Sequence, residues 1–168
     1  MVWFRVRMLM NDSKNLSMLS EKIRILAIDD EPEFTHLVKL NLEATGRYEV
    51  VEENLDTCAL TTARLIHPDV ILVDLIMPHL SGTDLIAQLK TDDHLRGIPV
   101  VLLTALISDD RLEAQHGMVE GSPSLTKPVS VENLRACLEQ CLKNREGQTE
   151  ELSRRSRASS STGSGSGG

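Results

Sequence analysis

The alternation of short apolar runs with segments of helical periodicity constrains the fold of this chain more than any other feature. The apolar runs are rich in Val, Ile and Leu, which is typical of strands buried on both faces of a sheet. After the first run, apolar residues recur at helical spacing from Pro32 and stop before Gly46. This pattern of strand and helix repeats five times. The predicted strands are residues 24–30, 48–51, 69–77, 99–105 and 125–127.

The intervening segments predict five helices. Ser81 and Ser130 are suitable N-cap residues for two of them, and His67-Pro68 ends another. Strands that alternate with helices form a parallel sheet, because each right-handed crossover lays a helix over the sheet. The sequence therefore predicts one α/β domain with helices on both faces and a site at the carboxyl ends of the strands. The predicted helices are residues 32–45, 56–66, 81–89, 108–117 and 130–142.

Charge and cysteine content limit the function classes. The 168 residues carry a formal charge of −7 at pH 7, which argues against generic binding to nucleic acid. Residues 1–20 contribute +2 and residues 145–168 contribute +1, so subtraction leaves −10 for residues 21–144. Three cysteines do not make a secreted disulfide framework and fit a reducing compartment. A cytoplasmic location is therefore expected.

The two ends of the chain are expected to lie outside the domain, which is predicted to span residues 21–144. Residues 1–20 are interpreted as a disordered or upstream N-terminal segment, because Arg5 and Arg7 interrupt their apolar residues. Residues 145–168 lose the apolar periodicity and end in Ser and Gly, so a flexible polar tail is predicted there. No apolar run approaches the roughly 20 residues of a membrane-spanning helix.

Unusual polar residues fall at the ends of the predicted strands. Asp29 and Asp30 follow the first strand, Asp74 follows the apolar core of the third, Thr104 ends the fourth and Lys127 ends the fifth. Three carboxylates in one crevice repel one another unless a cation neutralises them. Mg²⁺ suits such a site because it takes oxygen ligands and needs only a few protein carboxylates.

The same constellation indicates acyl-phosphate chemistry. An aspartate can attack phosphorus, and Asp74 has beside it one ammonium group, from Lys127, and one hydroxyl, from Thr104, to take up charge on the transferring oxygens. The sequence contains neither G-x-G-x-x-G nor G-x-x-x-x-G-K-[ST], so a nucleotide-binding function lacks its usual phosphate loop.

These residues, in this order and at these separations, resemble the receiver domain of two-component response regulators. The resemblance covers residues 23–144 and extends to Pro78, Gly82, Ala105 and Pro128. It implies a flavodoxin-like (βα)5 domain with five parallel strands in the order 2-1-3-4-5. It also implies a cis peptide before Pro128.

The resemblance also implies a role for each site residue. Asp74 accepts a phosphoryl group from a histidine kinase or a histidine phosphotransfer protein, assisted by Thr104 and Lys127. The Mg²⁺ ligands are Asp30, Asp74 and the Ile76 carbonyl, with Asp29 nearby or acting through water. The protein is then expected to be a signalling phosphoacceptor and not an enzyme, although it assists its own phosphorylation and dephosphorylation. Its output is expected to be contact with an unknown downstream protein, without direct nucleic-acid binding by this chain.

One departure from the family leaves an alternative open. The position three residues before Lys127 is often aromatic in the family, and here it is Ser124. A pseudo-receiver that binds partners without carrying phosphate is therefore an alternative. A weaker alternative is an aspartate-nucleophile phosphohydrolase, which would need a carboxylate two residues after Asp74, where the chain has Ile76.

Two further groups are interpreted as packing residues. Cys137 and Cys141 have the spacing of half a metal site, but no second pair follows, and small buried apolar side chains explain them better. Leu134, Leu138 and Leu142 fit core packing first, and a homodimer contact is a secondary interpretation.

Overall fold

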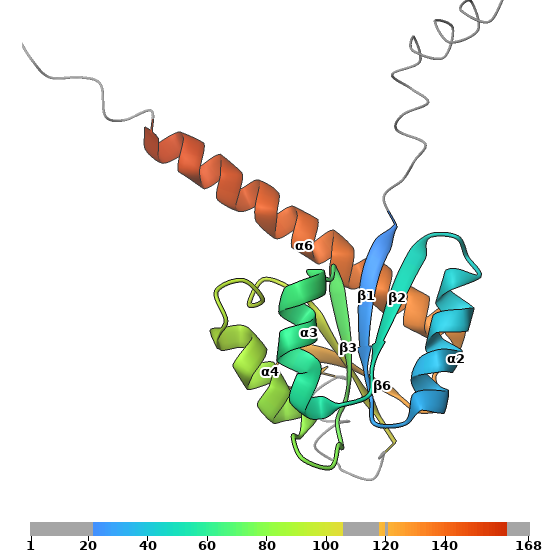
Figure 1. Cartoon of the computed structure of the whole chain (residues 1–168). Helices are drawn as coiled ribbons and strands as arrows, with labels where there is room; N and C mark the ends of the chain where they lie inside the picture. The colour runs from blue at the N-terminus through green and yellow to red at the C-terminus, as the bar shows by residue number, and fades with distance from the viewer. Residues whose placement is uncertain (1–21, 106–117, 120, 161–168) are drawn as a thin grey trace, which may run out of the picture.

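Five parallel strands form one sheet, as predicted, in the order β2-β1-β3-β4-β6, and a short strand β5 extends the β6 edge (Figure 1). The computed structural model describes residues 22–105, 118–119 and 121–160. Its elements are β1 (Ile23–Ile28), α2 (Pro32–Glu43), β2 (Tyr48–Glu53), the 3₁₀ turn η2 (Asp56–Cys58), α3 (Ala59–Ile66), β3 (Val70–Asp74), α4 (Gly82–Thr91), β4 (Val100–Thr104), β5 (Met118–Val119), β6 (Ser122–Thr126) and α6 (Val131–Ser160).

The strand order follows from the pairing registers. β1 lies between β2 and β3, with Ile23 opposite Tyr48 and Ile25 opposite Val70, and both pairings are parallel. β4 continues the sheet from β3 to β6. The predicted order and the flavodoxin-like topology are thereby confirmed.

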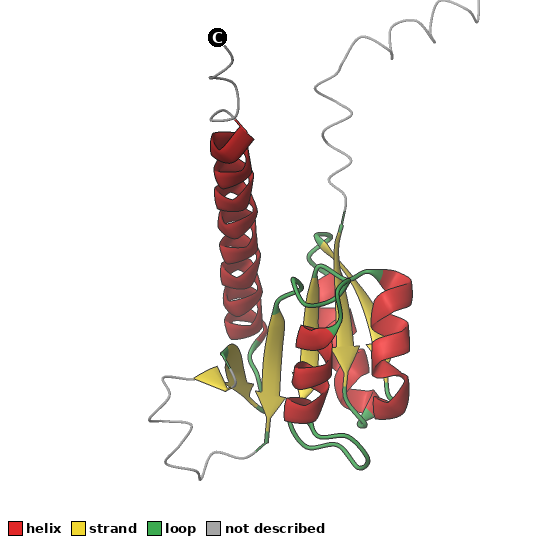
Figure 2. Cartoon of the chain, turned by 90° about the vertical axis from the view of Figure 1, so that its left-hand side faces the viewer, coloured by secondary structure: helices red, strands yellow, loops and turns green. Residues whose placement is uncertain are grey.

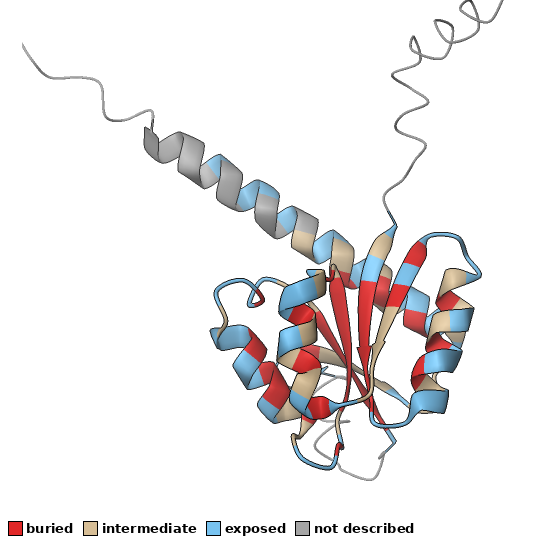
Figure 3. Ribbon diagram, viewed as in Figure 1, coloured by how far each residue is buried: buried red, intermediate tan, exposed pale blue. Residues whose placement is uncertain are grey.

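Helices cover both faces of the sheet, and each face has its own core. Side chains alternate along β1, so Ile25 and Ala27 pack toward α2 and α6, whereas Leu26 and Ile28 pack toward α3 and α4. All five residues of β3 and of β4 are buried, which explains why their sequences are continuous apolar runs (Figure 3). Aliphatic residues dominate both cores.

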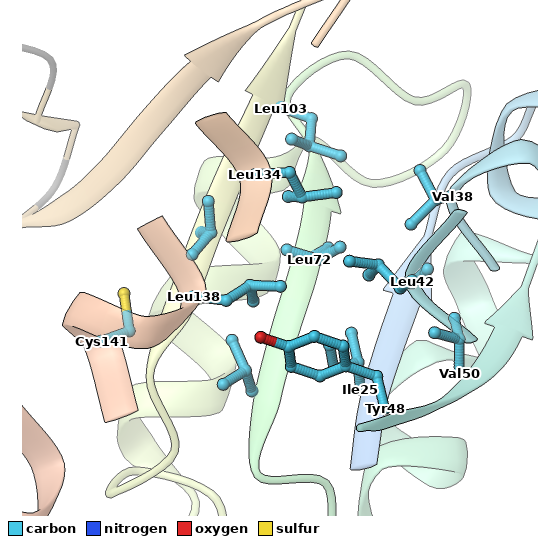
Figure 4. Packing of buried hydrophobic residues seen from close by; sticks show 13 residues of the cluster. Ile25, Val38, Leu42, Tyr48, Val50, Leu72, Leu103, Leu134, Leu138 and Cys141 are labelled. Carbon is cyan, nitrogen blue, oxygen red and sulfur yellow. The ribbon is translucent and has the colours of Figure 1, made fainter. Parts of the chain in front are cut away.

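Among the described residues, Tyr48 is the one fully buried aromatic residue in the core on the α2 and α6 face. It is fully buried, and its hydroxyl faces the part of α6 that carries Leu138 (Figure 4). This hydroxyl has no hydrogen-bond partner in the part of the chain that the structure describes. Cys141 packs in the same cluster and Cys137 packs against it, as expected for packing residues.

The C-terminal helix differs from the prediction. A flexible tail was predicted from residue 145, but α6 continues without interruption to Ser160 and projects beyond the sheet (Figure 2). The prediction is wrong for residues 145–160, because the helix continues beyond the point where its apolar periodicity stops. This segment has no proline and is rich in Arg and Glu, which are good helix formers. Glu150 and Arg154 also form an i,i+4 ion pair at 3.8 Å.

The remaining differences concern the β6 edge and segments outside the described residues. β6 begins at Ser122, earlier than the predicted start at 125, because it pairs antiparallel with β5 as well as parallel with β4. The predicted helix at residues 108–117, the expected N-terminal segment 1–20 and the end of the tail at 161–168 lie outside the described residues.

Candidate functional site

The site lies at the carboxyl ends of four neighbouring strands. Asp29 follows β1, Asp74 is the last residue of β3, Thr104 is the last residue of β4 and Lys127 follows β6. Parallel pairing brings these ends to one edge of the sheet, which is the lower edge in Figure 1. The structure therefore brings together the residues that the sequence placed at the strand ends.

Three aspartates form the acidic part of the site. One carboxylate oxygen from each of Asp29, Asp30 and Asp74 lies within 4.8 Å of the other two. Asp29 and Asp74 are buried, whereas Asp30 is exposed. The backbone positions Asp29 through its own N–H, which donates to the Glu53 carbonyl at 3.2 Å. The site is thus a small acidic crevice that is open to solvent on the side of Asp30.

Lys127 reaches into this crevice and bridges the two buried acids. Its Nζ lies 2.6 Å from Oδ2 of Asp29 and 2.8 Å from Oδ1 of Asp74. The same ammonium lies 4.2 Å from the centroid of the Phe34 ring. At the backbone, Lys127 N–H donates to the Thr104 carbonyl at 2.7 Å, and the bond between Lys127 and Pro128 is cis, as the resemblance implied.

The protonation equilibria of Asp29 and Lys127 are coupled through this contact. Burial raises the pKa of Asp29, and the hydrogen bonds from Lys127 and from the Glu31 N–H offset this only in part. Burial by itself would lower the pKa of Lys127, but the bonds to Asp29 and Asp74 outweigh it, so this pKa is raised. Lys127 is therefore positively charged throughout the neutral range.

The loop between β3 and α4 carries the remaining predicted ligand, the Ile76 carbonyl. Ile76 N–H donates to Oδ2 of Asp74 at 2.9 Å, which ties the loop to the acid it follows. Gly82 closes the loop by donating its N–H to the Leu75 carbonyl at 3.0 Å. A Cβ at Gly82 would overlap the Asp74 carbonyl oxygen and lie 2.9 Å from Leu75 Cα, so the close approach requires glycine.

Two residues near the site were not identified as site residues from the sequence. Phe34 lies in the predicted helix of residues 32–45, and its ring faces Lys127. Asp56 is the first residue of the predicted helix of residues 56–66, and its carboxylate accepts N–H groups of His79 and Leu80 in the β3–α4 loop. Neither role leaves a local signal, because each partner is distant in the sequence.

The donor set fits a magnesium ion. Carboxylate oxygens from Asp29, Asp30 and Asp74 converge within the span that one cation can bridge, and Asp30 leaves room for water. Hard oxygen donors without Cys or His favour Mg²⁺ over zinc or copper. Cys137 and Cys141 belong to no such cluster among the described residues.

Comparison with known proteins decides the family. The family model for the response regulator receiver domain matches residues 25–139. The chain belongs to the response regulator receiver family. Receiver domains are signalling phosphoacceptors of two-component systems, interact with histidine kinases and generally bind Mg²⁺ at an acidic pocket.

The chain matches relatives that are much longer than the matched region and relatives that are little longer than it. The DNA-binding dual master transcriptional regulator RpaA of Synechocystis is 36% identical over 115 residues, which are 67% of this chain and 46% of that protein. The polar-differentiation response regulator DivK of Brucella ovis is 34% identical over 108 residues, 64% of this chain and 85% of DivK. The chain spans about half the length of RpaA and of the mycobacterial regulators TcrX and MtrA.

Solved structures agree with the fold. The chemotaxis protein CheY4 of Vibrio cholerae has a TM-score of 0.63 at 26% identity, covering 72% of this chain and 99% of that chain. A response regulator receiver domain from Clostridium thermocellum has a TM-score of 0.63 at 29% identity, covering 73% of this chain and 96% of its own. No described helix is both long and apolar enough to cross a membrane.

Proposed function

We propose that Asp74 accepts a phosphoryl group from a histidine kinase or a histidine phosphotransfer protein in a magnesium-dependent reaction. The observation that carries the proposal is the setting of its carboxylate, with Oδ1 2.8 Å from the Lys127 ammonium and Oδ2 accepting the Ile76 N–H. Two further carboxylates, Asp29 and Asp30, lie beside it. This combination of one nucleophile, one fixed cation and a divalent-cation site is what phosphoryl transfer to a carboxylate requires.

The chemistry is one displacement at phosphorus. A carboxylate oxygen of Asp74 forms the new P–O bond, and the bond between phosphorus and the imidazole nitrogen of the donor phosphohistidine breaks. The electron pair of that bond stays on the imidazole. Asp30, Asp74 and the Ile76 carbonyl, with Asp29 directly or through water, would hold Mg²⁺, which would supply positive charge for the transfer.

The other side chains prepare and hold the product. The Lys127 ammonium pairs with the phosphoryl group, so it exchanges a carboxylate partner for a phosphoryl oxygen. Thr104 is buried at the end of β4 and offers its hydroxyl to the phosphoryl group. This new contact links phosphorylation to β4 and so biases a two-state switch. Ser124 stands half-buried in β6 where the family often has an aromatic residue, so the aromatic part of that switch is missing.

We infer the remaining assignments from the family and the sequence. The receiver domain spans residues 21–144, with the N-terminal segment and the C-terminal segment outside it. The chain acts in the cytoplasm, is not an enzyme in its own right, and signals by contact with a downstream protein, without itself binding nucleic acid. A homodimer is a secondary proposal; Leu134 and Leu138 are buried in the core, so such a contact would have to use other residues.

Intact-mass measurement tests the phosphoacceptor assignment directly. The protein is incubated with Mg²⁺ and a small acyl phosphate, beside the variant Asp74→Asn and the control Asp93→Asn, which changes an exposed acid (82% exposed side chain). We expect the wild type and the control to gain the mass of one phosphoryl group and Asp74→Asn to remain unmodified. An unmodified wild type would refute the proposal and favour the pseudo-receiver alternative.

A further inference from the structure

A buried carboxylate outside the acidic crevice holds the β3–α4 loop. Asp56 is the first residue of η2, between β2 and α3, and its side chain is only 4% exposed. Across from it lies the loop of residues 75–81, which joins Asp74 to α4. Asp56 is eighteen residues before Asp74 in the sequence, so this contact is purely tertiary.

The contact is made to the backbone of the loop. Oδ2 of Asp56 accepts the N–H of His79 at 2.7 Å and the N–H of Leu80 at 3.0 Å. Oδ1 accepts the N–H of Thr57 at 2.7 Å, and Nδ1 of His79 lies 3.3 Å away. Burial by itself would raise the pKa of Asp56, but these N–H donors outweigh it and lower the pKa, so the group stays ionised.

Asp56 holds the middle of the loop, between backbone hydrogen bonds at its start and at its end. At its start, Leu75 N–H donates to the Leu103 carbonyl at 2.8 Å, and at its end Gly82 N–H donates to Leu75. Between these points lies Ile76, whose N–H donates to Asp74 and whose carbonyl is the proposed magnesium ligand. The hydrogen bonds that the His79 and Leu80 N–H groups donate to Asp56 fix the path of the chain from Ile76 to α4.

We propose that Asp56 is a positioning residue for phosphoryl transfer, which keeps Ile76 in place beside Asp74 by anchoring His79 and Leu80. The inference rests on the proposed function of Asp74. A misplacement of about 1 Å in such a site slows a reaction by up to about a hundredfold. Loss of the Asp56 attachment is expected to slow phosphorylation by about tenfold.

Asp92 offers a matched control. Its carboxylate is also nearly buried (8% exposed) and accepts the His94 N–H at 2.9 Å and Arg64 Nε at 2.7 Å. Asp92 follows the last turn of α4, at the end of that helix remote from Gly82. Asp92→Ala therefore removes the same kind of anchor without touching the β3–α4 loop.

The experiment compares Asp56→Ala, Asp56→Asn, Asp92→Ala and His79→Ala with the wild type. Phosphorylation rates are measured with a small acyl phosphate at saturating Mg²⁺, and Mg²⁺ affinity is measured by calorimetry without phosphodonor. We expect Asp56→Ala to be slow and to bind Mg²⁺ more weakly. Asp56→Asn should recover most of the rate, because one amide oxygen can still accept both loop N–H groups. Asp92→Ala and His79→Ala should match the wild type, because the loop is held through its backbone.

Each outcome is decisive. A wild-type rate in folded Asp56→Ala, or an equal loss in Asp92→Ala, overturns the positioning role. If Asp56→Ala does not fold, Asp56→Asn is the deciding variant. The proposal is overturned if the His79 and Leu80 amides of Asp56→Asn exchange hydrogen faster than in the wild type while the phosphorylation rate is unchanged. A wild-type protein that is never modified refutes the proposed function instead. In that case Mg²⁺ affinity alone judges Asp56, and an unchanged affinity in Asp56→Ala overturns its role.

Discussion

The substitution Lys127→Met isolates the charge balance of the site. Methionine keeps most of the apolar length of the lysine and its contact with the Phe34 ring, but it removes the ammonium group. Two buried ion pairs are then lost, at 2.6 Å to Asp29 and 2.8 Å to Asp74. The lysine side chain is 11% exposed and that of Asp29 only 1%, so solvent screens these pairs weakly.

The magnitude follows from leaving two buried carboxylates without their counter-charge. Removing one partner of a buried pair costs about 3 to 5 kcal/mol of unfolding free energy. Because the crevice opens to solvent at Asp30, we take the lower end, about 3 kcal/mol near neutral pH without Mg²⁺. Lys39→Met is the control, since the Lys39 pair with Glu52 is 3.4 Å long and the lysine is 35% exposed. Its loss should cost under about 1 kcal/mol.

The pH dependence gives the sharper test. The pKa of Asp29 is already raised above its ordinary 3.8 in the folded protein, and losing Lys127 raises it further. A carboxyl group with a raised folded pKa costs stability when ionised, and the cost disappears as pH falls through that pKa toward 3.8. The deficit of Lys127→Met is therefore full near neutral pH and shrinks on acidification.

Urea unfolding followed by circular dichroism measures both effects. The wild type, Lys127→Met and Lys39→Met are compared near neutral pH and near pH 4, in the presence of a chelator. A second series adds Mg²⁺, which should stabilise Lys127→Met more than the wild type, because the cation replaces the lost charge. A deficit that does not change with pH, or one no larger than that of Lys39→Met, would refute the reasoning.

Three further predictions concern folding and the approach to the site. Tyr48→Phe should raise the unfolding free energy by about 1 kcal/mol, because it removes a fully buried hydroxyl that has no partner among the described residues. A loss of stability in urea melts would contradict this. Gly82→Ala should destabilise the folded protein by about 2 kcal/mol and slow phosphorylation, since the methyl group would overlap the backbone of Asp74. Urea melts measure the stability and intact mass measures the phosphorylation. No change in either would show that α4 can shift freely. Ser81→Ala should cost about 1 kcal/mol, because the Ser81 hydroxyl accepts the Asp84 N–H at 3.2 Å as the N-cap of α4; a loss below about 0.3 kcal/mol in the same melts would count against the cap.

Local periodicity was a reliable guide to most of the fold. The runs at residues 24–30 and 99–105 became β1 and β4, because a strand buried on both faces must be apolar along its whole length. The extension of α6 was also encoded locally, in helix-forming residues, but the prediction tied the end of the helix to the end of its apolar face. A polar helix can continue once its first turns are docked, because propagation is easier than nucleation.

The sequence by itself determined the parallel sheet and the meeting of Asp29, Asp74 and Lys127 at one edge. Few folds other than a parallel sheet suit alternating strands and helices. Residues at the carboxyl ends of parallel neighbouring strands then lie at the same edge of the sheet. Only the tertiary structure decided that Lys127 bridges the two acids beneath Phe34, and that Asp56 holds the loop after Asp74. These contacts join residues whose separation in the sequence follows no local period. They depend on how loops meet after the strands are paired, and no pattern within one segment records that.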